Sequence, residues 1–229
     1  ALLVPETKVV SKISTPEAAI TLVESNKVPF RFVPGLSFFY QGEIPRQLGV
    51  FIDGSSFFTM DEVSTDQYYQ HIVPFLPYYL KKESSTDILQ LGLTGVNRIR
   101  LAKKTKLNSL TIVEPNLALV DLLKDSIVAS YTKDILNEPK INILVENARS
   151  YLASNIKKFT IIDLSLTNFS SDQSSAAILG SYHELYTTEA FKGYHKALNN
   201  NGMLSISLWS STPPIQIARL WNTLKEASF

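Results

Sequence analysis

The pattern of hydrophobic and polar positions changes near residue 87. Before this point, short runs that alternate polar and apolar residues, or that are apolar and bounded by turn residues, predict the strands of a small antiparallel meander. These runs are residues 7–13, 19–23, 36–40, 48–52 and 57–60. Asp53-Gly54, between the last two runs, is a strong hairpin-turn pair. Residues 1–62 are therefore predicted to form an N-terminal antiparallel β-domain.

Residues 63–86 are predicted to connect this domain to the rest of the chain. Ser64-Thr65-Asp66 offers N-cap side chains for a helix that carries several tyrosines. Pro74 and Pro77 are expected to kink or end this helix, because proline lacks the N–H that a helix interior needs. The tyrosines are expected to form a helix face packed between domains. The polar residues 81–86 complete the connection.

After residue 87, apolar strand-like runs alternate with helix-like segments. The strand-like runs are residues 88–92, 109–113, 141–145, 159–163 and 203–208. Helices are predicted over residues 117–129 and 187–198, the second one stopped by residues 199–202, and a last helix is expected to start with Thr212 as its cap. Repeated β-α-β units with apolar strands predict an α/β fold whose parallel sheet is covered on both faces. Residues 168–175 form a polar loop in this scheme.

Composition excludes several classes of protein. Of the 229 residues, 45% are hydrophobic and 19% are charged, which excludes a mainly disordered chain. The formal net charge of +1 gives no sign that nucleic acid or an anionic membrane surface is a partner. The sequence has no cysteine, which excludes a disulfide scaffold, a thiolate metal site and a cysteine nucleophile, and its three widely spaced histidines do not suggest a metal site. No run reaches the ~18 apolar residues of a membrane-spanning helix.

The carboxyl ends of the strands are where an open parallel sheet binds its ligands. The first strand ends at Gly92, and Gly95 follows, so the backbone can approach a ligand closely there, although an ordinary strand-to-helix turn explains the two glycines equally well. The second strand ends at Glu114, about 20 residues after the glycine turn, where an acid can accept hydrogen bonds from both ribose hydroxyls of a nucleoside. The alternative is that Glu114 only complements the dipole of the following helix.

The third and fourth strands also end in polar residues. Asn147, followed by Ala148, can bond an adenine edge through its side-chain amide, or it can be only the N-cap of the next helix. Asp163, followed by Leu164, can orient or deprotonate an amine beside the ligand crevice, or it can be a capping or turn aspartate. Of these candidates, Asp163 is the one that we expect to act in catalysis.

These residues, in this order, resemble the spermidine synthase (polyamine aminopropyltransferase) family over most of the chain. Residues 51–54 are similar to that family's Leu-Asp-Gly hairpin, and Tyr69-Gln70-His71 lies where the family carries Tyr-His-Glu. Residues 87–95 are similar to its glycine-rich nucleoside loop, and residues 185–191 are similar to its Leu-Tyr-x-x-Glu-Phe segment.

The resemblance implies a function and a set of site residues. A methyltransferase-like Rossmann domain, residues 87–229, would follow the β-domain and bind decarboxylated S-adenosylmethionine or S-adenosylmethionine as its co-substrate, without a metal. The reaction would move an aminopropyl group to a small-molecule amine, a step of polyamine biosynthesis. The matching positions are Asp163 and Tyr69 for catalysis, and Gly92, Gly95, Glu114, Asn147, Ala148, Asp163 and Leu164 for the nucleoside. The resemblance also suggests a homodimer.

The likeness extends to a branch of spermidine-synthase-like domains in membrane-fused proteins, which carry segments similar to residues 35–54 and 208–214. The chain starts without methionine and stops inside a predicted helix, so we expect a soluble, cytoplasmic domain of an integral membrane protein, with membrane-spanning segments outside these residues. We also expect the Rossmann domain to be truncated at its C-terminus, which would leave an open sheet edge.

Two departures from the family concern acidic residues. The family's Asp-Ser-Ser-Asp-Pro reads Asp-Leu-Ser-Leu-Thr at residues 163–167, so Leu166 replaces the second acid, and His71 replaces the glutamate of Tyr-His-Glu. A diamine carries two positive charges, and each lost acid removes a partner for them. Three hypotheses remain open: an aminopropyltransferase with Asp163 as base or orienting group, a catalytically weakened ligand-binding or regulatory domain, and an S-adenosylmethionine-dependent methyltransferase. The fold does not decide among them.

Overall fold

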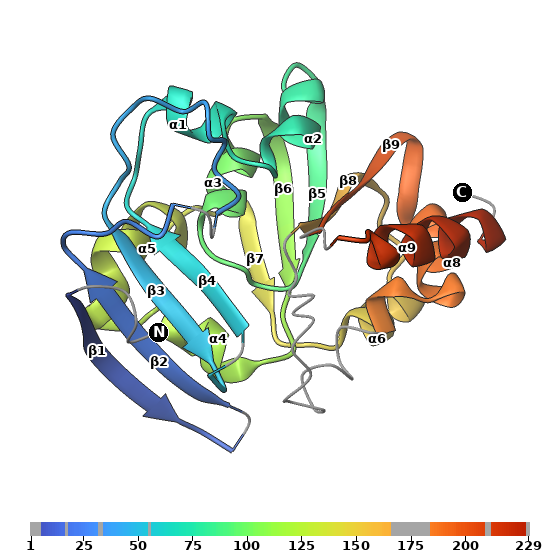
Figure 1. The fold of residues 1–229 in the computed structure, drawn as a ribbon. Coiled ribbons are helices and arrows are strands. Elements are labelled where there is room, and N and C mark those ends of the chain that lie inside the picture. Colours follow the sequence, from blue (N-terminus) through green and yellow to red (C-terminus); the bar gives the residue numbers. More distant parts are fainter. Residues whose placement is uncertain are drawn as a thin grey trace.

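The computed structural model describes residues 6–16, 18–31, 34–54, 56–165, 184–208 and 212–227. It shows an antiparallel sheet and a parallel sheet, with helices between the two sheets and on the far face of the parallel one (Figure 1). The predictions for Leu166 and for the polar loop at residues 168–175 lie outside the described residues.

The N-terminal sheet is the predicted antiparallel meander. It consists of β1 (Thr7–Ser14), β2 (Ala19–Ser25), β3 (Gln47–Ile52) and β4 (Ser56–Asp61), in that order across the sheet. Asp53 and Gly54, between β3 and β4, have φ angles of 50° and 69°. This left-handed conformation is the one that a tight hairpin turn requires, and the predicted turn is confirmed.

The strand predicted over residues 36–40 is wrong. Leu36 forms only an isolated bridge with Ile72, and no strand continues from it. The physical reason is the guanidinium of Arg31, which donates from Nη2 to the carbonyl oxygens of residues 37, 38 and 40 at 3.3, 3.2 and 2.9 Å. A neighbouring strand would need these carbonyl groups as acceptors. Because Arg31 already donates to them, their hydrogen bonds are made without pairing to another strand.

Two short helices, α1 (Asp66–Gln70) and α2 (Phe75–Leu80), connect the sheets. Thr65 caps α1 as predicted, since its Oγ1 accepts a hydrogen bond from the N–H of Tyr68 at 3.3 Å. Pro74 separates the helices. Pro77 does not end a helix as expected but lies in the first turn of α2, where N–H groups have no intrahelical partner and proline is tolerated.

The second sheet is entirely parallel, as predicted. Its strands are β5 (Ser85–Leu91), β6 (Lys106–Val113), β7 (Ile141–Leu144), β8 (Phe159–Ser165) and β9 (Leu198–Ser207), in the order β7-β6-β5-β8-β9. β5 begins at Ser85, inside the segment that was expected to be a linker. The strand order reverses between β5 and β8, so the ligand crevice of such a sheet is expected where these two strands end.

Helices cover both faces of the parallel sheet (Figure 1). They are α3 (Asn97–Lys103), α4 (Leu117–Leu122) and α5 (Ala129–Leu136) toward the antiparallel sheet, and α6 (Ala148–Ser154), α8 (Thr188–Ala197) and α9 (Ile215–Glu226) on the other face, with short 3-10 turns at Ser126–Val128 and Glu184–Tyr186. Neighbouring residues of one strand therefore enter different cores. Ile88 packs in the core shared with the antiparallel sheet, and Leu89 packs against α6 and α8.

Two helix predictions need correction. The helix expected over residues 117–129 ends at Leu122, because Asp125 accepts a hydrogen bond from the N–H of Ile127 at 2.9 Å and starts a new turn. The last helix begins at Ile215 and not after Thr212, since a residue that precedes proline disfavours the helical conformation and Pro214 follows Pro213. Residues 199–202 follow the end of α8 at Ala197, as predicted, and form an irregularity inside β9.

The two sheets touch at a glycine. Gly95 has a φ of 96°, and a Cβ atom at this position would lie 2.4 Å from the carbonyl oxygen of Thr59 in β4. The turn that follows β5 therefore packs directly against the antiparallel sheet, at a distance that only glycine permits.

We expect Gly95→Ala to lower the free energy of unfolding by about 2–4 kcal/mol, because alanine would add a strained φ and a clash with Thr59. Gly193→Ala is the matched control, since Gly193 lies in α8 and a Cβ atom there meets nothing within 4 Å. It should stabilise the protein by up to about 1 kcal/mol. Urea unfolding measures both effects, and equal stability of Gly95→Ala and the parent would contradict this contact.

Candidate functional site

Asp163 lies at the carboxyl end of β8 with a fully buried side chain. Its Oδ2 accepts hydrogen bonds from the hydroxyl of Tyr78 at 2.5 Å and from Nε of Arg98 at 3.0 Å. Its Oδ1 accepts a hydrogen bond from the hydroxyl of Ser165. The carboxylate is therefore neutralised by a guanidinium and held by three donors of the protein.

Arg98, from α3, connects the ends of two strands. Its Nη2 donates to the carbonyl oxygen of Asp163 at 2.6 Å, and its Nη1 donates to the carbonyl oxygen of Gly92 at 3.1 Å and to Oγ1 of Thr94 at 3.0 Å. Burial by itself would lower the pKa of Arg98, but the attraction of Asp163 raises it above its ordinary value. The guanidinium therefore stays charged and holds the glycine turn against β8.

Tyr78 is a residue of this site that the sequence analysis missed. Its hydroxyl accepts a hydrogen bond from Nε2 of Gln90 at 2.8 Å and donates to Asp163. Burial, and then the negative charge of Asp163, raise the pKa of Tyr78 well above its ordinary value, so it remains a hydrogen-bond donor. No local pattern distinguishes Tyr78 from its neighbour Tyr79, because the contact joins residues 85 positions apart.

Tyr69, the tyrosine expected to act in catalysis, lies elsewhere. Its hydroxyl accepts a hydrogen bond from the N–H of Ser64 at 3.2 Å, and its ring packs edge-on against Tyr68 with ring centres 5.6 Å apart. Burial raises the pKa of Tyr69. In the described part of the chain, the tyrosine that contacts Asp163 is thus Tyr78.

Glu114 ends β6 and contacts the glycine turn after β5. Its Oε2 accepts a hydrogen bond from the N–H of Leu93 at 2.7 Å, and its Oε1 accepts one from the N–H of Asn116 at 2.8 Å. Gly92, beside Leu93, has a φ of 81°, the left-handed conformation that glycine adopts without strain. The side chain of Glu114 is 1% exposed, and this burial raises its pKa to about 7.

The remaining predicted residues have structural partners. Asn147 caps α6, since its Oδ1 accepts hydrogen bonds from the N–H groups of Arg149 and Ser150 at 2.9 and 3.3 Å, while its Nδ2 donates to Glu184 at 3.2 Å. Ala148 is the buried first residue of α6. Leu164 is fully buried in the core that β8 forms with α6 and α8.

The structure thus brings together part of the predicted set. Arg98 joins Gly92 to Asp163, and the N–H of Leu93 joins the same turn to Glu114. In the described residues, His, Asp and Glu side chains do not gather in groups of three that could hold a metal ion. The arrangement supplies one buried carboxyl directly after β6 and one buried carboxylate at the end of β8.

Comparison with known proteins identifies the fold. No protein-family model matches the sequence, and neither does any curated protein. A crystal structure of spermidine synthase in complex with the transition-state analogue AdoDATO aligns with a TM-score of 0.62 and 15% identity, over 96% of this chain and 64% of that chain. A crystal structure of spermidine synthase from Thermotoga maritima aligns with a TM-score of 0.60 and 16% identity, over 96% of this chain and 63% of that chain.

The chain therefore shares the fold of spermidine synthases and spans less than two-thirds of their length, 64% and 63% in these two cases. This confirms the predicted α/β class, with a Rossmann-like sheet of the methyltransferase type preceded by a small antiparallel sheet. Among the described helices, none combines the length and the apolarity needed to cross a bilayer.

Removing Arg98 tests the buried ion pair. We expect Arg98→Met to lower the free energy of unfolding by about 3–5 kcal/mol, because it leaves the carboxylate of Asp163 buried without a cation. Adding Asp163→Asn should recover part of this loss, since the uncompensated charge is then gone. The control is Arg46→Met, which breaks a surface pair with Glu24 and should cost at most about 1 kcal/mol. Urea unfolding that shows equal losses in Arg98→Met and Arg46→Met would contradict the assignment.

The buried carboxyl of Glu114 makes stability depend on pH. Its pKa is about 7 in the folded chain and near the ordinary value of 4.5 in the unfolded chain, so the folded state holds a proton that the unfolded state has lost between these values. Stability from this group is present below about pH 4.5 and is lost, by about 3 kcal/mol in total, as the pH rises through about 7. Glu114→Gln should remove this loss, and the exposed Glu43→Gln should retain it. Urea unfolding across this pH range gives the free energy of unfolding of each protein. If it depends on pH in the same way in the parent and both variants, Glu114 is not the group responsible.

Proposed function

We propose that this chain binds an S-adenosylmethionine-derived nucleoside where β5, β6 and β8 end, and transfers the aminopropyl group of decarboxylated S-adenosylmethionine to an amine. In this reaction the amine nitrogen attacks the aminopropyl carbon attached to the sulfonium sulfur. The carbon–sulfur bond breaks, the sulfur keeps the electron pair as a thioether, and the amine loses a proton. The fold shared with spermidine synthases supports the proposal.

The observation that carries the proposal is the contact between Glu114 and the glycine turn. The 2.7 Å hydrogen bond from the N–H of Leu93 fixes the acid beside the backbone that would approach the nucleoside. A carboxylate offers about four acceptor positions, and the two backbone N–H groups occupy two of them, so two remain for the ribose hydroxyls. Because Glu114 is 1% exposed, the ribose reaches it by displacing the groups that cover it.

The surroundings of Asp163 favour a second candidate, a nucleoside-binding or regulatory domain without turnover. Its carboxylate is fully buried, paired with Arg98 and bonded to Tyr78 and Ser165. Three donors of the protein already occupy this carboxylate, and its side chain does not reach the surface. Transfer therefore requires the incoming amine to displace Tyr78 or Ser165 from Asp163.

Calorimetry with decarboxylated S-adenosylmethionine, S-adenosylmethionine and methylthioadenosine tests the proposal, together with a turnover assay with putrescine. We expect the decarboxylated form to bind most tightly. Ribose hydroxyls favour the ionised form of Glu114, so binding near pH 6 should release protons, and affinity should rise as the pH approaches about 7. Glu114→Gln should weaken binding by about 1–3 kcal/mol and abolish the proton release, while Glu43→Gln should change neither.

The outcomes separate the hypotheses. Turnover with putrescine that is lost in Asp163→Asn, with nucleoside binding retained, supports the transferase. Binding without turnover supports the second candidate, and preference for S-adenosylmethionine itself supports a methyltransferase. If none of the three nucleosides binds, both the transferase and the binding domain are refuted.

A further inference from the structure

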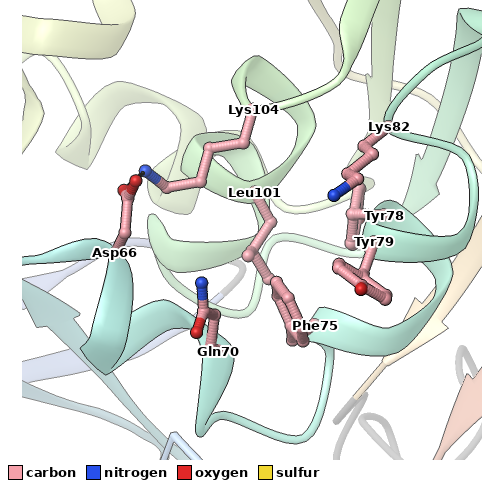
Figure 2. Close-up of a pocket in the computed structure, with 8 residues that line it drawn as sticks. All are labelled: Asp66, Gln70, Phe75, Tyr78, Tyr79, Lys82, Leu101 and Lys104. Atoms are coloured by element: carbon pink, nitrogen blue, oxygen red, sulfur yellow. Dashed lines mark hydrogen bonds and ion pairs between the residues drawn. The ribbon is translucent and has the colours of Figure 1, made fainter.

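A hollow of 340 Å³ lies between α1, α2 and α3, at the end of α3 that is farther from the glycine turn. Figure 2 shows its lining, which consists of Asp66, Gln70, Phe75, Tyr78, Tyr79, Lys82, Leu101 and Lys104. Its volume falls in the range of about 300–1,000 Å³ that is typical of small-molecule sites. Of its lining residues, only Tyr78 also belongs to the site of the function proposed above.

The charges of the lining are unbalanced. Lys104 pairs with Asp66, and its Nζ lies 4.8 Å from the ring centre of Tyr69. Lys82 places its Nζ 4.6 Å from the ring centre of Tyr79, and within the described residues no carboxylate pairs with it. Two lysines and one aspartate leave a net charge of +1 in the lining. A bound group with one negative charge would neutralise this net charge.

The lining of the hollow is about equally polar and apolar, and two aromatic rings form its flat part. The rings of Phe75 and Tyr79 lie 5.2 Å apart at an angle of 34°, and Tyr79 is 48% exposed although it lines the hollow. Leu101 points toward Phe75 from α3, and the amide of Gln70 is directed into the space between Asp66 and Phe75 (Figure 2). Exposed aromatic surface beside an ammonium that has no carboxylate partner among the described residues suits a ligand that is both flat and anionic.

We infer that this hollow is a second binding site, for a small monoanion with a flat apolar body, such as an aromatic carboxylate. The anionic group lies at Lys82, the apolar body covers Phe75 and Tyr79, and Gln70 offers a hydrogen bond. Asp66 does not repel the ligand, because Lys104 neutralises it.

Tyr78 makes the floor of the hollow rigid. It lines the hollow, and its hydroxyl is fixed between Asp163 and Gln90 of the parallel sheet. The site is therefore formed before the ligand arrives, which lowers the cost of binding.

The first test is calorimetric titration of the protein with naphthoate, with naphthylmethanol as the neutral analogue of the same shape and with inorganic phosphate as the anion without a ring. We expect naphthoate to bind at least about threefold more tightly than either control, and to weaken as ionic strength rises, because a partly exposed ion pair contributes modestly and is screened. Equal binding of naphthoate and naphthylmethanol, or the absence of naphthoate binding, would overturn the inference.

The second test compares variants of exposed lysines, whose folds circular dichroism can verify. Lys82→Met should weaken naphthoate binding by about threefold to fivefold and leave naphthylmethanol unchanged, and Lys82→Arg should restore it. Lys133→Met, on the exposed surface of α5, is the matched control and should bind like the parent. Equal loss in both methionine variants, or no loss in either, would place the ligand elsewhere. These results do not depend on nucleoside binding, which uses other ligands and the residue Glu114.

Discussion

The carboxyl edge of the parallel sheet depends on one buried ion pair, between Arg98 of α3 and Asp163 of β8. The guanidinium donates to the carboxylate and carbonyl of Asp163, to the carbonyl of Gly92 and to Thr94, so it holds the end of β5 against the end of β8. Removing two charges from water is costly, and such a pair is tolerated only when its remaining donors and acceptors are satisfied. Tyr78 and Ser165 meet this condition on the side of the carboxylate.

The same helix connects the parallel sheet to the antiparallel one. Arg100 donates to both carboxylate oxygens of Asp134 at 2.9 and 2.8 Å, and also to the carbonyl of Asp61 at the end of β4. Asn97 donates to the carboxylate of Asp61 at 2.8 Å. Gly95 also packs against β4. Contacts from both sheets therefore fix the edge of the parallel sheet where a ligand is expected. Its geometry therefore depends on how the sheets pack, and not on the glycine turn alone.

The positions of Glu114 and Asp163 favour ligand binding, but their hydrogen bonds to the protein oppose it. The fold places two acids at the carboxyl ends of β6 and β8, beside the point where the strand order reverses. Both acids bind donors of the protein itself: Glu114 binds two backbone N–H groups, and Asp163 binds Arg98, Tyr78 and Ser165. A ligand that binds either acid must compete with these donors, so the strength of these hydrogen bonds limits its affinity.

The sequence by itself determined the parallel strands, the hairpin at Asp53-Gly54 and the helix caps at Thr65 and Asn147, because each depends on residues close together in the chain. It also placed Glu114 and Asp163 at strand ends. Only the tertiary structure decided their partners. It put Tyr78 beside Asp163. It also made residues 36–40 a loop whose carbonyl oxygens accept hydrogen bonds from Arg31. Packing across 65 and 85 positions of sequence creates the contacts of Asp163 with Arg98 and Tyr78, and no local periodicity records such distances.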